Sequence, residues 1–382
     1  MDNKYTVPFK QIYNNDPSNA LHRNSIVARL HIDLPLFTCM FFCFLIGLLL
    51  IYSAKLEMHL VQKQMVNFAV ASVLMLIVAQ AQPRSYRTWA PILYYSSLSI
   101  LILVLIIGDI SKGAQRWLDL GLLRFQPAEL MKLAVPLMVA RTLDEHILPP
   151  SPKLLLLSLV YIMVPVVLIA KQPDLGTAIL VASTGLFVLF FAGISWKLII
   201  SITTLAIVSF PVLWAVLRDY QRKRILTLFN PELDPLGSGY HIIQSKIAIG
   251  SGGFFGKGWL NGTQSHLEFL PERATDFIFA VLGEEFGLLG VLVLLLLYVL
   301  IIIRGLYIGM RANNTFSRLL AGSLIMTFFV YLFVNIGMVN GILPVVGIPL
   351  PLVSYGGTSL VTIMIGLGML MSIQTHRNLV RK

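Results

Sequence analysis

The sequence predicts an all-α, polytopic membrane protein, and its composition and apolar pattern indicate this. Hydrophobic residues make up 57% of the 382 residues, charged residues only 12%, and the mean hydropathy is +0.80. A soluble globular chain normally carries about twice that share of charged residues. Apolar runs of about 20 residues, the length that one bilayer-spanning helix needs, recur along the chain. One helical membrane domain therefore accounts for most of the sequence.

Ten apolar runs, separated by polar or proline-rich breaks, mark the predicted spanning helices. They lie near 34–53, 65–82, 91–108, 127–142, 154–170, 174–192, 197–217, 277–303, 317–341 and 352–373. This even number places both termini on one side of the membrane. Residues 1–33 are polar and mixed in charge, so we expect no removable signal peptide there. They form an N-terminal segment before the helical domain at 34–373, and residues 374–382 form a tail.

The basic residues of the short breaks predict the orientation. Lys and Arg are more frequent in the breaks on the N-terminal side, which hold Arg84, Arg87 and Arg304, than in those on the opposite side. Short cytoplasmic loops are enriched in Lys and Arg, so both termini are predicted to be cytoplasmic. The one large loop, at 218–276, then lies outside the cytoplasm. Its apolar middle predicts amphipathic pieces along the membrane surface.

A charged run passes directly into an apolar helix in EFLPERATDFIFAVLGEEFGLLG, residues 268–290. Asp276 stands at this junction, where it could be a catalytic carboxylate or could simply cap the helix. Glu284 and Glu285 lie about two turns further on, where an ionised carboxylate at mid-bilayer costs roughly 2.5–3.5 kcal/mol. We expect them to pair with a basic group of a neighbouring helix or to face a wet cavity.

Cationic side chains gather on the side that holds the large loop. Lys112, Arg116 and Trp117 lie in one break, and Glu129 and Lys132 lie at the start of the next helix. Lysine and arginine donate charge-assisted hydrogen bonds to phosphate oxygens, so this group could bind an anionic ligand such as a diphosphate. Alternatively, the cations contact lipid headgroups in general, and Glu129 pairs with Lys132 along the helix.

Two further segments place polar or helix-breaking residues on that side. QPDLGT, residues 172–177, puts Asp174 at a helix start, which is also ordinary capping. NGILPVVGIPLPLVSYGGTS, residues 340–359, interrupts a membrane helix. Non-helical backbone at that depth is tolerated only where it is buried in protein or lines a cavity, so Ser354 is predicted to line a pocket. The glycine-rich GSGGFFGKG, residues 250–258, lacks the residues of a P-loop.

Six motifs together resemble the SEDS family of cell-wall polymerases from the first helix to the last. KGAQRW, FQPAELMK, QPDLGTA, AIGSGGFFGKG, the TDFIFAVLGEE run and GIPLPLVSYGGTS occur in the order and spacing of that family. GTQSHLEFLPER and the final SYGGTS are similar to the RodA branch, which serves side-wall elongation, rather than to the division-specific FtsW branch. Ala274 departs from the pattern, because a histidine is common there, so that position is not essential to the chemistry.

The resemblance implies a ten-helix peptidoglycan glycosyltransferase that polymerises lipid II, a disaccharide-peptide carried on undecaprenyl diphosphate. Asp276 matches the catalytic aspartate of the family. Its implied role is that of a general base, which takes the proton from the 4-hydroxyl of the acceptor sugar in a single inverting displacement. The candidate substrate-binding residues are Lys112, Arg116, Trp117, Glu129, Lys132, Asp174, Arg273 and Ser354.

The same chemistry limits the expected cofactors and partners. A leaving diphosphate needs Lys and Arg side chains or a divalent cation such as Mg²⁺ or Mn²⁺ to stabilise its charge. The sequence identifies no metal ligands, and no organic cofactor or nucleic acid is expected. The resemblance implies that a class B penicillin-binding protein and the elongation machinery are partners in the bacterial inner membrane. The active site is expected to face the periplasm.

Two other classes of function remain open at this point. A lipid II flippase would also have many helices, intramembrane acids and a cavity. A transporter should need polar groups on both sides of its pathway, whereas the informative polar residues here lie on one side. A structural scaffold for the elongation machinery would leave the acidic residues free to be replaced without consequence.

Overall fold

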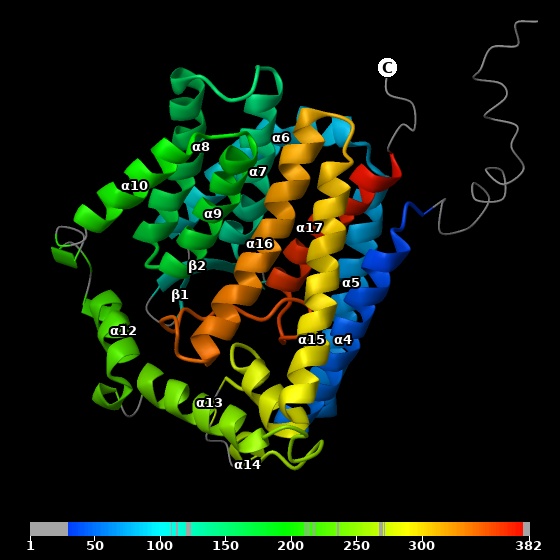
Figure 1. Ribbon diagram of the computed structural model, residues 1–382, viewed down its shortest axis with the longest axis vertical. Helices are drawn as coiled ribbons and strands as arrows, with labels where there is room; N and C mark the ends of the chain where they lie inside the picture. The colour runs from blue at the N-terminus through cyan, green and yellow to red at the C-terminus, as the bar shows by residue number, and fades with distance from the viewer. Residues whose placement is uncertain are drawn as a thin grey trace, which may run out of the picture.

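The computed structural model describes residues 30–107, 109–111, 114–119, 124–209, 211, 214–215, 217, 219–234, 237–266, 270 and 272–376. Within them the chain forms a bundle of long helices with a small sheet at one side (Figure 1). The helices of the bundle are α4 (Leu34–Lys55), α5 (Met58–Gln80), α6 (Pro83–Ile107), α7 (Pro127–Asp144), α8 (Pro152–Lys171), α9 (Leu175–Phe191), α10 (Trp196–Val208), α15 (Ile278–Met310), α16 (Thr315–Val339) and α17 (Thr358–Thr375).

Each predicted spanning segment overlaps one of these helices, and the differences lie at the ends. The largest is at α10, which ends at Val208, nine residues before the predicted end at 217. α5 begins seven residues earlier than predicted, and α17 begins at Thr358 rather than at 352 because the proline-rich segment before it is not helical. Seven described helices, α4, α5, α6, α8, α15, α16 and α17, are long and apolar enough to cross a membrane, and the apolar α9 is shorter. The all-helical membrane fold is confirmed, whereas the number of ten crossings stays a prediction.

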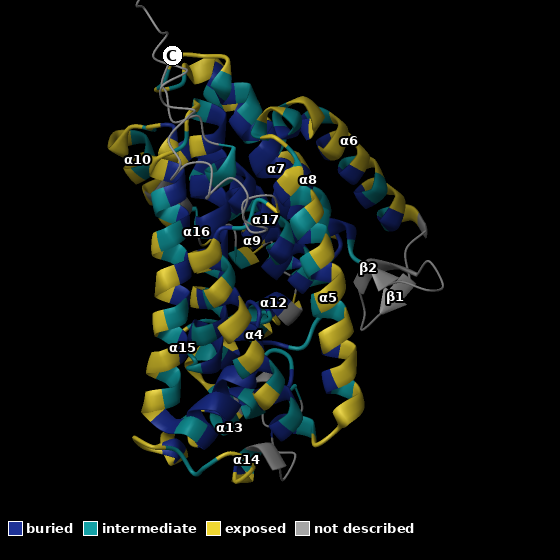
Figure 2. Cartoon of the chain, turned by 90° about the vertical axis from the view of Figure 1, so that its right-hand side faces the viewer, coloured by how far each residue is buried: buried dark blue, intermediate teal, exposed yellow. Residues whose placement is uncertain are grey.

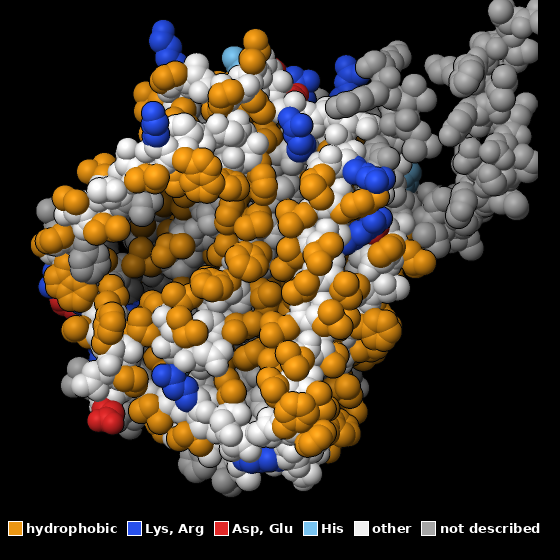
Figure 3. Space-filling model, viewed as in Figure 1, with side chains coloured by type: hydrophobic (Ala, Val, Ile, Leu, Met, Phe, Trp, Pro, Cys, Tyr) orange, Lys and Arg blue, Asp and Glu red, His pale blue; other side chains and the backbone are white. Residues whose placement is uncertain are grey.

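Apolar side chains cover the outside of the bundle. Exposed leucines and valines run along the outer faces of α5 and α15, including Val66 and Val73 on α5 and Leu292 and Leu296 on α15. In Figure 2, exposed residues line the outward sides of α5 and α15, and buried residues lie inside the bundle. In Figure 3, apolar side chains spread across the middle of the molecule, and Lys and Arg lie toward its upper and lower parts. Hydrocarbon, rather than water, suits such a surface, so the chain is a multi-pass membrane protein.

The two described ends of the chain meet at one end of the bundle. The rings of His31, just before α4, and His376, just after α17, stack with centroids 4.2 Å apart. Nearby, Asp33 caps α4 by accepting a hydrogen bond from the Leu36 amide (3.1 Å), and Arg304 of α15 binds both oxygens of Asp33 (3.1 and 2.6 Å). His31 and His376 therefore lie at the same end of the bundle, and the placement of both termini in the cytoplasm stays a prediction.

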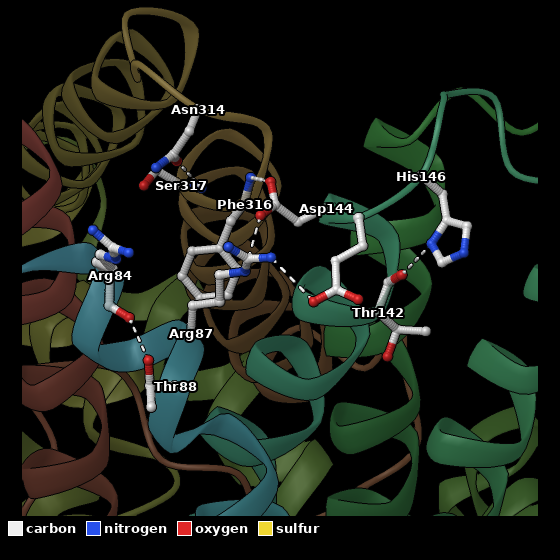
Figure 4. A network of polar contacts seen from close by, with 10 residues as sticks. Arg84, Arg87, Thr88, Thr142, Asp144, His146, Asn314, Phe316 and Ser317 are labelled. Atoms are coloured by element: carbon white, nitrogen blue, oxygen red, sulfur yellow. Dashed lines mark hydrogen bonds and ion pairs between the residues drawn. The ribbon is translucent and has the colours of Figure 1, made fainter.

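A polar network at the same end joins α6, α7 and α16. Arg87 of α6 binds Asp144 and Glu145 at the end of α7, each at 3.1 Å. Asp144 also accepts a hydrogen bond from the Phe316 amide (2.9 Å), so it satisfies one of the free amides at the start of α16. Figure 4 shows these contacts, with the Asn314 side chain capping the same helix start.

Three short antiparallel strands lie between α6 and α7, and the sequence did not predict them. They are β1 (Asp109–Ser111), β2 (Ala114–Asp119) and β3 (Arg124–Phe125), in the order β1-β2-β3. The segment is too polar to extend the apolar helix before it, and strand pairing satisfies the backbone groups that a helix would otherwise bond. The predicted break between α6 and α7 thus holds a small sheet, within a fold that is otherwise helical.

The predicted large loop contains several short helices at the end of the bundle opposite to the chain ends (Figure 1). They are α12 (Asp219–Phe229), the 3-10 helix η1 (Pro231–Leu233), α13 (Ser238–Gly252) and α14 (Thr263–His266). The glycine-rich segment after α13 packs backbone to backbone against α15, where the amides of Lys257 and Gly258 bind the carbonyls of Glu284 and Glu285 (3.0 and 2.9 Å). Its glycines thus permit close packing at the kink of α15, which lies at Gly287.

Candidate active site around Asp276

Asp276 lies in the turn 272–277 that leads into α15, and its side chain is half-buried. The residue at the N-cap position of α15 is Phe277, directly after Asp276. The choice between a catalytic and a capping role for Asp276 stays a prediction. A methyl group at Gly347 would lie 3.2 Å from Asp276 Oδ2. The carboxylate thus lies beside the non-helical segment between α16 and α17, which we call the 340–357 segment.

Backbone hydrogen bonds hold the Asp276 turn against the 340–357 segment. The Tyr355 amide donates to the Ala274 carbonyl (2.9 Å), and the Ser354 hydroxyl donates to the Thr275 carbonyl. Ser354 Oγ also accepts a hydrogen bond from the Leu350 amide (2.8 Å). Ser354 is buried, and both of these contacts are to the protein backbone, so its described role is to hold the turn. Its predicted role in lining a substrate pocket stays a prediction.

Asn335 of α16 completes this arrangement, and sequence reasoning missed it. Its side chain is fully buried, and its Nδ2 donates to the carbonyl of Asp276 (2.9 Å) and to the carbonyl of Ile348 (2.7 Å). One amide group therefore joins three separate segments of the chain. The available signal was a single asparagine within an apolar helix, since buried polar groups are nearly always hydrogen-bonded.

Gln64 of α5 binds the same segment from the other side. It is fully buried, its Nε2 donates to the Ser354 carbonyl (3.2 Å), and its Oε1 accepts from the Gly356 amide (3.3 Å). Backbone groups that have no helical partner are thus satisfied by side chains of the surrounding helices. Residues 350–354 of this segment are buried in protein, as expected, whereas Ile342 near its start is 68% exposed.

Glu129 and Lys132 form a buried pair on α7. Lys132 Nζ lies 2.6 Å from Glu129 Oε1 and also bonds the hydroxyl of Tyr331, and the three side chains are almost fully buried. Glu129 and Lys132 therefore pair along one helix, as the alternative to a ligand site predicted. Tyr331 lies one helical turn before Asn335 on α16, so the pair is on the side of that helix that carries the Asp276 contact. A cavity between α7, α16 and α17 adjoins Lys132 and Tyr331.

Asp174 caps α9, as the capping alternative predicted. Its Oδ1 accepts a hydrogen bond from the Thr177 amide (3.2 Å), and its Oδ2 accepts one from Gln126 Nε2 (3.0 Å). A methyl group at Gly176 would overlap with the side chain of Val346. The start of α9 therefore touches the 340–357 segment, which also carries Gly347 beside Asp276.

The structure describes few or no side-chain contacts for the remaining four candidate residues. Arg273 is buried, and its Nε donates to the carbonyl of Ala54 at the end of α4. Lys112 lies outside the described residues. Arg116 and Trp117 lie in β2, but their side chains are not among the described ones. The predicted contacts of these four residues with substrate stay predictions.

The two intramembrane acids near the start of α15 are held by hydrogen bonds. Glu284 Oε1 lies 2.7 Å from Lys257 Nζ and also accepts from Thr263 Oγ1 (3.0 Å) and the Gln264 amide (2.9 Å). The expected basic partner is present, but it comes from the large loop rather than from a neighbouring helix. Glu285 accepts a hydrogen bond from Ser53 of α4. The Glu284 contacts fasten the large loop to α15, and the Glu285 contact joins α15 to α4.

His241 of α13 packs close to this turn and gives a pH prediction. Its ring centroid lies 5.5 Å from that of Phe277. Burial lowers the pKa of His241 from the ordinary value of 6.5, and Glu272 and Asp234 only partly oppose this. The His241 ring therefore binds a proton more readily in the unfolded chain than in the folded one. As a result, the free energy of unfolding should fall as the pH drops below about 6.5. Between about pH 7.5 and 5.5, the melting temperature should fall less for His241→Gln than for the native chain. An equal fall in the two proteins would contradict this prediction.

Gly347 gives a second prediction, because its φ of +81° favours glycine. Alanine in this left-handed region costs roughly 1–2 kcal/mol, and its methyl would press on Asp276 Oδ2 at 3.2 Å. We expect Gly347→Ala to lower both the melting temperature and the catalytic rate. Gly250→Ala is the matched control, since no atom lies within 4 Å of the added methyl. If both variants behaved like the native chain, the described position of the carboxylate would be wrong.

The described residues contain no group of three or more His, Cys, Asp and Glu side chains that could hold a metal ion. Of the two acids that were candidate substrate-binding residues, Glu129 binds Lys132, and Asp174 binds the Thr177 amide and Gln126. We therefore assign no step of the reaction to a metal, and the predicted Mg²⁺ or Mn²⁺ requirement stays a prediction.

The fold and this site define a multi-pass helical membrane protein with a carboxylate held at the junction of its largest loop and a broken-helix segment. A family model described as cell cycle protein, of the FtsW, RodA and SpoVE type, matches residues 33–379. The chain belongs to this family, which confirms the resemblance found in the sequence.

Known relatives and solved structures agree with this assignment. The chain is 55% identical over 356 residues to the peptidoglycan glycosyltransferase MrdB of Escherichia coli (strain K12), covering 93% of this chain and 96% of that protein. It matches a chain of a peptidoglycan synthase complex with a TM-score of 0.80 and 32% identity, over 91% of this chain and 99% of the other. It also matches the rod shape determining protein RodA of Thermus thermophilus with a TM-score of 0.69 and 28% identity, over 91% and 98% of the two chains.

Proposed function

We infer that this chain is a RodA-like peptidoglycan glycosyltransferase that polymerises lipid II during cell elongation. The 55% identity to the glycosyltransferase MrdB over nearly the whole chain supports the activity. The observation that carries the site is the position of Asp276, whose turn is held by hydrogen bonds from α16 and from the 340–357 segment. A general base must be held at a fixed distance from the hydroxyl that it deprotonates.

In the proposed reaction, Asp276 takes the proton from the 4-hydroxyl of the acceptor sugar. The acceptor oxygen attacks the anomeric carbon of the donor, and the bond from that carbon to the diphosphate breaks. Because the donor is α-linked and the product is β-linked, one inverting displacement is sufficient. The departing diphosphate carries away the electron pair of the broken bond. Lys112 and Arg116 are the proposed cations that stabilise this charge, and Lys132 contributes from its pair with Glu129.

The proposed setting is the bacterial inner membrane, with both termini cytoplasmic and Asp276 facing the periplasm. A class B penicillin-binding protein is the proposed partner, because one structural neighbour is a peptidoglycan synthase complex that coordinates polymerization and crosslinking. Its transpeptidase would crosslink the glycan that this chain makes.

The test is glycan formation from purified lipid II by the full chain, together with a partner penicillin-binding protein whose transpeptidase has been inactivated. We expect polymer that a glycan-degrading muramidase digests. Addition of EDTA tests the proposed divalent cation in the same assay. A chain that makes no polymer, yet moves labelled lipid II across a vesicle membrane, would instead be a flippase.

A further inference from the structure

A polar pocket opens at the end of the bundle that carries both chain ends, far from Asp276. α15 separates the two places, and its 33 residues span about 50 Å at 1.5 Å per residue. The pocket lies between the start of α6, the turn between α15 and α16, and the end of α17. Its polar lining residues include Gln82, Arg84, Asn313, Asn314, Ser317 and His376.

The pocket has an unbalanced positive charge. Arg84 lines it, and no Asp or Glu is among its described lining residues. Within the part of the chain that the structure describes, the Arg84 guanidinium makes no hydrogen bond or ion pair, and only its backbone carbonyl is bonded, to Thr88 Oγ1 (3.2 Å). Figure 4 shows Arg84 turned away from the network of Arg87. Asp144 and Glu145, the two acids of that network, are paired with Arg87.

The other polar groups of the pocket add hydrogen-bond donors. Asn314 uses its Oδ1 to cap α16 by accepting from the Ser317 amide (2.8 Å), which leaves its NH₂ group as the unused part of that side chain. Asn313 and Gln82 are exposed amides at the rim. An arginine with amide donors around it, and without a carboxylate, is the set of groups that binds phosphate oxygens.

The surface next to the pocket indicates which phosphate-bearing molecule would bind there. α6 continues from Arg84 as an outward apolar helix, on which Trp89 is 50% exposed and Ile92 is 67% exposed. Tryptophan is enriched at the boundary between the hydrocarbon and the headgroups. A phosphate in the pocket would therefore lie at headgroup depth, with acyl chains along α6.

We propose that this pocket binds the phosphate group of an anionic phospholipid, with the Arg84 guanidinium as the main contact. This site is separate from the proposed sugar chemistry, and its test does not depend on that activity. A soluble phosphate would present the same oxygens, so the experiment must distinguish the two sources.

The experiment measures lipid retention by the full chain. Native mass spectrometry counts phosphatidylglycerol molecules bound to the protein after release from nanodiscs of phosphatidylcholine with rising phosphatidylglycerol. We expect Arg84→Gln to weaken binding of one phosphatidylglycerol molecule about tenfold, since one charge-assisted contact is lost. Arg318→Gln is the matched control, because Arg318 is exposed on α16 and does not line the pocket. Unchanged melting temperatures establish that both variants are folded.

Two results would overturn the proposal. Equal retention by all three proteins would show that Arg84 binds no headgroup, and an equal loss in both variants would show only general attraction of anionic lipid to a basic surface. A parallel titration with inorganic phosphate in detergent separates the sources. If phosphate binds in an Arg84-dependent way while phosphatidylglycerol does not, the proposed lipid is wrong.

Discussion

Replacement of Asp276 by asparagine is expected to lower the rate of glycan polymerisation by roughly 10²–10⁴-fold, the usual contribution of a general base. Asparagine has nearly the same shape but cannot accept the proton of the acceptor hydroxyl. The backbone carbonyl at this position would still be bound by Asn335, so the turn should keep its place. Turnover of purified lipid II, with the partner's transpeptidase inactivated, measures the rate.

The control for this prediction is Asp219→Asn in the same large loop. Asp219 is fully exposed, and its contact with Arg222 is long, at 4.0 Å. This variant loses the same charge and should turn over lipid II at the native rate. The general-base role is wrong if folded Asp276→Asn polymerises as fast as the native chain. If both variants lose activity equally, the loss follows from charge and not from the position of Asp276.

The positions of the helices could be predicted because a bilayer imposes one simple requirement on sequence. A run of about 20 apolar residues is visible without knowledge of its neighbours, and every predicted run overlaps a helix. The break at 340–357 was visible because its prolines and glycines interrupt such an apolar run. The strands β1 to β3 were not, because they are too short to show an alternating pattern.

The contacts of the site could not be predicted because they join residues far apart in the sequence. Gln64 and Ser354 are 290 residues apart, yet they bind directly. Asn335 is one polar residue in an apolar helix, and no spacing rule indicates that it reaches Asp276. The basic partner of Glu284 was expected on a helix, but a lysine of the glycine-rich segment supplies it. Asp276 itself was identified from the resemblance, and local sequence left its capping alternative open.

The arrangement of the site can be tested at Asn335, where Asn335→Ala is expected to reduce both stability and activity. The change leaves the buried carbonyls of Asp276 and Ile348 without their shared donor. Each unsatisfied buried group costs about 1–3 kcal/mol, which is enough to let the turn move. A displacement of about 1 Å can cost roughly 10²-fold in rate. We therefore expect the kcat of folded Asn335→Ala to fall by at least about tenfold, with a smaller change in KM.

Asn340→Ala, at the C-cap position directly after the same helix, is the matched control. Its Nδ2 donates only to the Ile336 carbonyl (2.9 Å), and that carbonyl also accepts from the Asn340 backbone amide (3.0 Å), so no buried carbonyl loses all of its donors. This variant should keep the native rate and melting temperature. A merely structural role for Asn335 would lower the melting temperature and leave the kcat per folded molecule unchanged. That outcome would mean that the carboxylate of Asp276 is held in place without the amide of Asn335.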